Sequence, residues 1–150
     1  MARSHPLTRL FGLRVVALAG VLLLSGASSV QPDETLEAVQ AALEDGSADG
    51  VLDQVGDRVE IVLFGQGGTY RRGQAVHVLR DFFRRSPPDR VALGSERSSS
   101  TDGRTAMGRY WTEDGGLPLQ VRVLHREDGD TWHLVSLHVE RQSFGRVGGR

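Results

Sequence analysis

The second half of the chain alternates between apolar and polar residues with the period of two that is typical of β-strands. This alternation runs from Arg90 to Gln142, and turns rich in glycine, serine and aspartate interrupt it three times. One turn contains Asp128-Gly129, a dipeptide that favours a tight hairpin between two alternating segments. We therefore predict four successive antiparallel strands. The predicted strands are 90–97, 104–113, 117–127 and 131–142.

An amphipathic helix is predicted immediately before these strands, over residues 73–85. Its apolar residues recur at helical spacing on one face: Ala75, Leu79, Phe82 and Phe83. Pro87-Pro88 ends the helix, because proline lacks the amide hydrogen that a helix needs. A sheet with one apolar face must bury that face against another element. We therefore expect this helix to cover the sheet.

The residues before this helix predict two shorter helices and a hairpin. Asp33 is expected to cap a helix over 35–44, and Ser47 to cap a short second helix. The β-branched run Val59–Phe64 indicates a strand, which a glycine-rich turn joins to a short strand at 69–71. The predicted fold class is α+β: a strongly curved antiparallel sheet of four main strands plus a short hairpin, wrapped around two to three N-terminal helices in a cone-like shape.

The last predicted hairpin requires one irregularity. A two-residue turn at Asp128-Gly129 places His125 opposite Trp132. Beyond Leu134, strict alternation would turn polar residues inward, so we predict one extra residue, a β-bulge, near 135–136. With that bulge, one apolar face holds Leu117, Leu119, Val121, Val123, Trp132, Leu134, Leu137 and Val139.

The first 27 residues show the three-part pattern of a secretory signal peptide. Arginines precede a ten-residue apolar run at 15–24, and the small residues Ser25-Gly26-Ala27 predict cleavage after Ala27. The run is shorter than the roughly 20 residues of a membrane-spanning helix. We expect an exported protein, periplasmic or secreted, without a stable membrane anchor after cleavage. The folded domain is expected over 28–142, followed by a disordered tail at 143–150.

Composition excludes several kinds of chemistry. The chain has no cysteine, which excludes disulfides, thiolate catalysis and cysteine-bound metals. All 18 basic residues are arginine, which excludes a catalytic lysine Schiff base and a P-loop lysine. Residues 28–150 carry 15 arginines and 19 acidic residues, a net charge of −4 that argues against nucleic-acid partners.

Three stretches resemble the nuclear transport factor 2-like superfamily, the cystatin-like α+β cones. They are the strand Val59–Phe64, the segment Tyr70–Ala75 leading into a helix that ends Asp81-Phe82-Phe83, and Asp130–Leu134 with Leu137–Val139, where a tryptophan precedes the bulge. The resemblance spans roughly 33–142 and is strongest to small exported bacterial proteins with an uncharacterised domain. The superfamily implies either enzymes (ketosteroid isomerase, scytalone dehydratase, polyketide cyclases) or non-catalytic binding and dimerisation modules, so the fold alone does not assign a function.

Proton-transfer chemistry would need a carboxylate base in an apolar setting. Glu60 is the acid inside the apolar run Val59–Phe64, and alternation points it outward. We therefore predict no catalytic residue. The three histidines of the last hairpin do not predict a metal site, because His125 faces one side while His133 and His138 face the other. We predict no metal and no cofactor.

A candidate ligand pocket combines aromatic and polar residues of the strands. Its residues are Tyr70, Arg109, Tyr110, Trp111, His125 and Trp132. Which of Tyr110 and Trp111 points inward depends on the register of the 104–127 hairpin, and the sequence leaves both registers open. Aromatic strand residues also serve as core, which is the alternative interpretation.

Arginines are also concentrated around the predicted helix. Between residues 70 and 90, six arginines face only Asp81 and Asp89. This excess could attract anions, or form an ordinary solvated helix face.

The expected function is a non-catalytic module that binds a small apolar ligand or a protein, with a homodimer through the sheet as one partner. The alternative is an isomerase, dehydratase or cyclase that uses the cone. A third hypothesis is an envelope protein that recruits anions through the arginine-rich helix.

Overall fold

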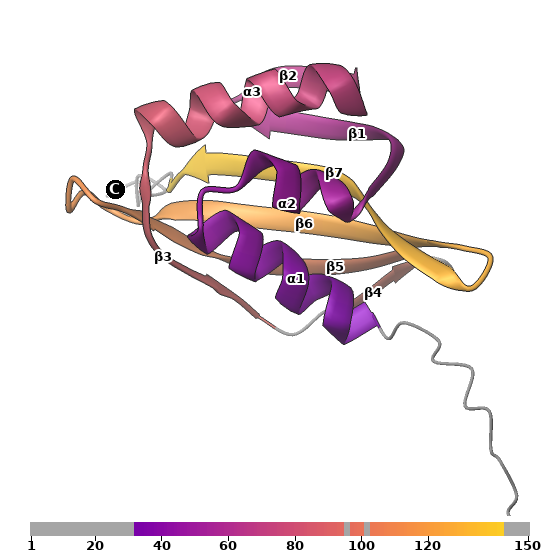
Figure 1. The fold of residues 1–150 in the computed structure, drawn as a ribbon. Helices are drawn as coiled ribbons and strands as arrows, with labels where there is room; N and C mark the ends of the chain where they lie inside the picture. Colours follow the sequence, from indigo (N-terminus) through magenta and orange to yellow (C-terminus); the bar gives the residue numbers. More distant parts are fainter. Residues whose placement is uncertain (1–31, 95–96, 101–102, 143–150) are drawn as a thin grey trace, which may run out of the picture.

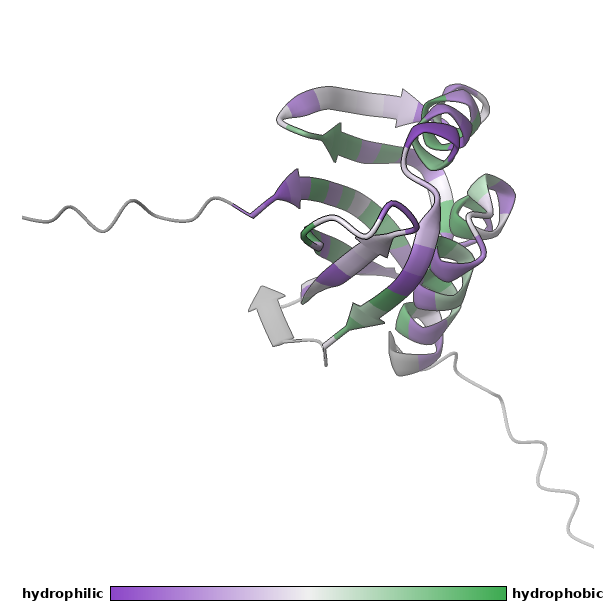
Figure 2. Cartoon of the chain, turned by 90° about the vertical axis from the view of Figure 1, so that its left-hand side faces the viewer, coloured by the Kyte–Doolittle hydropathy of each residue, from purple (hydrophilic) through white to green (hydrophobic). Residues whose placement is uncertain are grey.

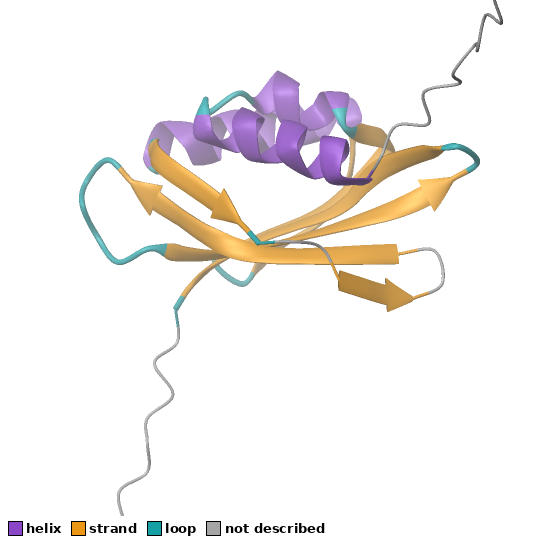
Figure 3. Cartoon of the chain, turned by 90° about the horizontal axis from the view of Figure 1, so that it is seen from below, coloured by secondary structure: helices purple, strands orange, loops and turns teal. Residues whose placement is uncertain are grey.

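Helices cover one face of a curved β-sheet in the computed structural model of the chain, which describes residues 32–94, 97–100 and 103–142 (Figure 1; Figure 3). The described residues form the helices α1 (Pro32–Glu44), α2 (Ala48–Asp53) and α3 (Arg72–Arg85). They also form the strands β1 (Val55–Leu63), β2 (Gln66–Arg71), β3 (Pro88–Leu93), β4 (Arg97–Ser100), β5 (Gly103–Thr112), β6 (Leu119–Asp128) and β7 (Thr131–Arg141). The predicted signal peptide at 1–27 and tail at 143–150 lie outside the described residues.

The predicted α+β fold class is confirmed, with one addition to the sheet. The strands lie in the order β2-β1-β7-β6-β5-β3, and β4 pairs with β5. The hairpin of β1 and β2 joins the four-strand sheet through a parallel pair between β1 and β7, whereas the other neighbouring strands are antiparallel. The predicted strand at 90–97 corresponds to β3, while β4 begins at Arg97 and occupies a stretch where a loop was expected; both strands pair with β5.

Glycine is required where β3 approaches β5. A Cβ at Gly108 would lie 2.1 Å from the carbonyl oxygen of Ala92, closer than any real contact allows. Because glycine has no side chain, β3 can pair with β5 at this point. β3 follows α3 in the chain and forms the edge of the sheet.

The predicted bulge is confirmed, but the register of its hairpin is corrected. Leu124 pairs with Ser136 and His125 pairs with Leu134, so Val135 is the extra residue on β7. His125 does not face Trp132, because the turn residues are Gly129 and Asp130. Only Gly129 has a positive φ (63°), which suits a turn with glycine at its first position.

The register of β5 on β6 is now defined. Tyr110 pairs with Leu119 and points inward, where it is fully buried, while Trp111 lies on the outer face of the sheet. Leu117 was expected on the apolar face of β6. It precedes that strand instead, in the loop after β5, and is 68% exposed.

The helices meet the sheet largely as predicted, and apolar residues gather between the two layers (Figure 2). The four predicted apolar residues of α3 are all buried. Ser47 caps α2 by accepting a hydrogen bond from the Gly50 amide, at 3.0 Å. Asp33, however, lies inside α1, which begins at Pro32, a residue suited to the first turn of a helix.

The interior of the cone is filled by side chains. The Phe82 ring lies 5.4 Å from the rings of both Phe83 and Tyr110. The Tyr110 hydroxyl donates a hydrogen bond to the Ser86 carbonyl at 2.5 Å, which ties β5 to the end of α3. In the described part of the chain, no helix has the length and apolarity to cross a membrane.

Candidate ligand-binding cleft

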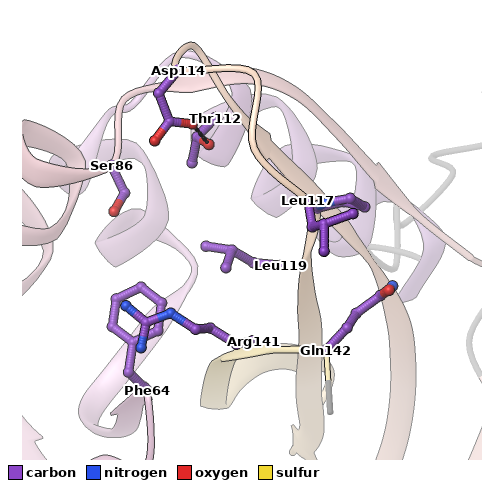
Figure 4. A pocket seen from close by; sticks show the side chains of 9 residues that line it. Phe64, Ser86, Thr112, Asp114, Leu117, Leu119, Arg141 and Gln142 are labelled. Carbon is purple, nitrogen blue, oxygen red and sulfur yellow. Dashed lines mark hydrogen bonds between the residues drawn. The ribbon is translucent and has the colours of Figure 1, made fainter. Parts of the chain in front are cut away.

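The open end of the cone is hollowed by two adjoining clefts. The hairpin cleft, about 690 Å³, is lined by Leu63, Phe64, Gln66, Gly67, Tyr70, Phe82, Arg85, Ser86 and Arg141. The loop cleft, about 380 Å³, is lined by Phe64, Ser86, Thr112, Asp114, Leu117, Pro118, Leu119, Arg141 and Gln142 (Figure 4). Phe64, Ser86 and Arg141 belong to both, so we call the two clefts together the mouth.

Turns, a loop and the ends of a helix and a strand form this mouth. The turn between β1 and β2 supplies Phe64, the residue after α3 supplies Ser86, and the end of β7 supplies Arg141. The loop between β5 and β6 supplies Leu117. Because these segments close the same end of the sheet, residues far apart in the sequence converge there.

Phe64 adopts an unfavourable backbone conformation. Its φ of 56° is the single positive value among the described residues other than glycine. Phe64 and Gly65 (φ 79°) form a two-residue turn that joins Leu63 to its partner Gln66. Both φ values are positive, as in a type I′ turn, where asparagine and glycine are the usual residues. A phenylalanine in the left-handed region costs about 1–2 kcal/mol.

The Phe64 side chain is nonetheless partly exposed to solvent, at 38%. Its ring lies 6.1 Å from the Phe82 ring, and the Arg141 guanidinium carbon lies 4.7 Å from its centroid. Strained residues of this kind concentrate at ligand sites. Of the large apolar residues that are exposed in the described part of the chain (Phe64, Met107 and Leu117), two line the mouth.

The charges of the mouth are unevenly distributed. Arg85 and Arg141 line the hairpin cleft, whose lining includes no carboxylate. Asp114 lines the loop cleft, where its carboxylate accepts hydrogen bonds from the Thr112 hydroxyl and from the Gly116 amide. These two hydrogen bonds lower the pKa of Asp114 below its usual value.

These groups favour binding over proton transfer. Because its pKa is lowered, the Asp114 carboxylate is a weak base. Burial raises the pKa of Tyr110, the Glu113 charge adds to the shift, and the hydroxyl proton is already engaged with Ser86. Neither group has a pKa near neutrality, as a general acid or base would require.

The six residues of the predicted pocket lie in different parts of the fold. Tyr70 lines the hairpin cleft, and none of the other five lines either cleft of the mouth. Tyr110 and His125 are buried in the core. Arg109 and Trp111 point to the outer face, because Tyr110 between them points inward. Trp132 lies near the far hairpin, with the Arg104 guanidinium 5.1 Å from its ring centroid.

Glu60 points outward, as predicted, and forms a small polar cluster on the outer face. Its carboxylate accepts a hydrogen bond from the Ser136 hydroxyl at 2.9 Å and lies 3.0 Å from His138 Nε2. These hydrogen bonds lower the pKa of Glu60. Both contacts end on Glu60 and do not join Ser136 to His138, so the cluster lacks the contact between nucleophile and base that covalent catalysis needs.

His125 is buried, whereas His133 and His138 are on the opposite face, as predicted. No group of three or more histidine, aspartate or glutamate residues suited to a metal ion occurs in the described ranges.

The arginines of α3 are paired more fully than the sequence indicated. Arg72 contacts Asp53 and Arg80 contacts Asp49, both at 2.8 Å, while Arg84 and Arg85 share Asp81. Asp49 and Asp53 belong to α2, outside the stretch in which charges were counted. The predicted excess of positive charge on α3 is therefore wrong, because acidic residues of α2 also pair with its arginines.

A model of the domain of unknown function DUF4783 matches residues 36–140. The chain belongs to the DUF4783 family. No curated protein is significantly similar to it in sequence. A DUF4783 family protein from Bacteroides uniformis has a similar structure, with a TM-score of 0.64 and 14% identity over 71% of this chain and 96% of that one.

Two further solved structures have a fold similar to that of this DUF4783 domain, and the resemblance predicted this kind of fold. One is an uncharacterised cystatin-fold protein from Novosphingobium aromaticivorans (TM-score 0.52, 17% identity, 72% of this chain and 96% of that one). The other is a nuclear transport factor 2-like protein of unknown function from Shewanella oneidensis (TM-score 0.55, 12% identity, 72% and 94%). At these identities the likeness concerns the fold alone.

Sequence reasoning missed the three residues that distinguish the mouth of this DUF4783 domain: Phe64, Leu117 and Arg141. For Phe64 the signal was weak, because it continues the apolar run Val59–Phe64 and is predicted at the end of that strand, whereas in the structure it is the first residue of the turn. For Leu117 and Arg141 no local pattern distinguishes a residue at the mouth from one that continues a strand.

Proposed function

We propose that this DUF4783 domain is a non-catalytic binding module whose mouth takes a small amphipathic ligand. One observation carries the proposal: Phe64 is held in a strained turn with its ring partly exposed in the wall shared by both clefts. The left-handed backbone of Phe64 costs about 1–2 kcal/mol. An aromatic ring kept exposed despite this cost suggests contact with something outside the fold.

The filled interior directs the ligand to the mouth. Tyr110, Phe82 and Leu79 occupy the space beneath α3 and are almost fully buried. A ligand would therefore rest on Phe64 and Leu117 at the entrance, where the clefts offer volumes in the range of small-molecule sites. The signal pattern at 1–27 supports export, so this ligand would be met in the periplasm or outside the cell.

Binding of the neutral fluorescent probe N-phenyl-1-naphthylamine tests this proposal. We expect the wild-type protein to enhance the probe's fluorescence, and Phe64→Ala and Leu117→Ala each to weaken its affinity about tenfold, because each removes apolar contact area. Met107→Ala is the matched control, since Met107 is also exposed but lies on the outer face of β5. No enhancement by wild type, or equal losses in the control and in Phe64→Ala, would refute the proposal.

A second candidate, self-association through the outer face of the sheet, is favoured by the charges on that face. Arg109 and Arg122, on β5 and β6, make no ion pair with any described residue. Glu60 and Glu140 lie on β1 and β7 of the same face, and β7 is the strand next to β6, so Glu140 lies close to Arg122. A two-fold axis through this face would bring the arginines of one copy onto the acids of its partner.

Sedimentation at several protein concentrations tests this second candidate. We expect a dimer that Arg109→Glu or Glu140→Arg alone weakens and that the double variant restores, because the charges then exchange sides. Arg84→Glu on α3 is the control, since this residue lies on the helical layer. A wild-type protein that stays monomeric at high concentration rules out the dimer.

A further inference from the structure

We infer that the ligand of the mouth is an amphipathic anion, with a carboxylate or similar monoanionic group between Arg85 and Arg141 and an apolar body along Phe64 and Leu117. This inference rests on the proposed binding function and adds the chemical class of the ligand and its orientation. It is carried by the difference between the two clefts, which share the Phe64 ring but differ in charge.

The hairpin cleft is the positive end of the mouth. It contains two arginines and no carboxylate, and the amide of Gln66 adds a neutral donor. The loop cleft presents the apolar side chains of Leu117 and Leu119, with the ionised Asp114 beside them. An anionic group would be attracted to the first cleft and repelled by Asp114 in the second. The charges therefore define one orientation.

Arg141 is available to bind an anion. Its guanidinium lies over the Phe64 ring, and it makes no ion pair with any described residue. Stacking on an aromatic face holds the guanidinium plane and leaves the N–H groups at its edge free to donate to a planar anion. Figure 4 shows Arg141 and Phe64 together on one wall, with Leu117 and Leu119 farther along the same space.

Arg85 can turn to a ligand at low cost. Its partner Asp81 also pairs with Arg84, so the carboxylate keeps one arginine if Arg85 leaves. The Arg85 side chain is 68% exposed, and ion pairs at such exposure contribute little. The two arginines could therefore hold one anion without leaving a charge unpaired.

Two probes with one scaffold test the inference. 1-Anilinonaphthalene-8-sulfonate carries a sulfonate that neutral N-phenyl-1-naphthylamine lacks. We expect wild type to bind the anionic probe at least about tenfold more tightly, as a charge-assisted hydrogen bond would give. Arg141→Gln should remove this preference and leave the affinity for the neutral probe unchanged. Arg58→Gln, an equal loss of charge at an exposed residue of β1 that lines neither cleft, is the control and should retain the preference.

The outcomes separate this inference from the proposed function. Equal affinities of wild type for both probes would overturn the anionic class and leave the binding function standing, whereas failure of both probes to bind would overturn both. Loss of the preference in Arg58→Gln as well would show a general charge effect and would also overturn the inference. Affinities that fall as protein concentration rises, with a dimer in solution, would show that a second copy occupies the mouth.

Competition distinguishes two sources of the anion. Octanoate carries its carboxylate on an acyl chain, and 3-phenylpropanoate carries it on an aromatic ring. Displacement of the anionic probe by either acid, but not by 1-octanol or 3-phenylpropanol, supports the inference, and the stronger acid competitor identifies the apolar body. Equal displacement by the matched alcohols would overturn it.

Discussion

At the scale of single residues, Phe64 has opposing effects on the stability of the fold, whereas its exposed ring serves the proposed binding site. Its left-handed backbone opposes stability, while its contact with Phe82 favours it. We predict that Phe64→Asn changes the free energy of unfolding by less than about 1 kcal/mol, because asparagine relieves strain as the ring contact is lost. Urea unfolding measures this free-energy change. The neutral probe should bind Phe64→Asn more weakly, because the aromatic ring is lost. Leu79→Ala, in the core, should by contrast cost about 2–5 kcal/mol.

Glu60 joins two elements, because it links β1 to β7 across the parallel pair of the sheet. Its pKa is lowered in the folded state by hydrogen bonds from His138 and Ser136. A lowered pKa adds stability above the unfolded value of 4.5, and this contribution is lost as the pH falls through the folded value. The stability difference between wild type and Glu60→Gln should therefore disappear in acid. Because Glu60 is half-exposed, we expect at most about 1 kcal/mol.

Urea unfolding from about pH 6 down to about pH 3, across the usual range of carboxyl pKa values, measures this difference. Glu140→Gln neutralises another carboxylate of the outer face and serves as the control. A Glu60→Gln difference that persists unchanged at the lowest pH would contradict the linkage.

Val135 is the extra residue of β7, and it absorbs the break in the alternation of that strand. We predict that its deletion is tolerated, because the remaining residues of β7 then alternate regularly and Leu137 and Val139 still face inward. Deletion of His138, beyond the bulge, should instead be severely destabilising, because it turns Val139 outward and Glu140 inward. Cooperative thermal unfolding, followed by circular dichroism, should persist in the first variant and be lost in the second. Equal damage in both variants would contradict the role of the bulge.

At the scale of the whole molecule, local patterns predicted the elements, and long-range pairing decided the rest. The face of α3 and the bulge at Val135 follow from periodicity within one segment. The parallel pairing of β1 with β7 does not, because it depends on two segments more than 70 residues apart in the sequence. The same reason limited the prediction of the site. Tyr70 reached the mouth, but Phe64, Leu117 and Arg141 converge there only because several turns and strand ends close one end of the sheet.

Tyr110 connects the core, the sheet and the end of α3, so its ionisation should report on the whole fold. Burial raises its pKa above the unfolded value of 10.0. A raised pKa adds stability that is present below the unfolded value and is lost as the pH rises through the folded one. In Tyr70→Phe, where Tyr110 is the remaining tyrosine, phenolate absorbance should therefore appear only together with alkaline unfolding. Phenolate absorbance that preceded the loss of tertiary circular dichroism would show that Tyr110 is accessible in the folded protein. The interior would then be open, and the ligand site would extend from the mouth into the cone.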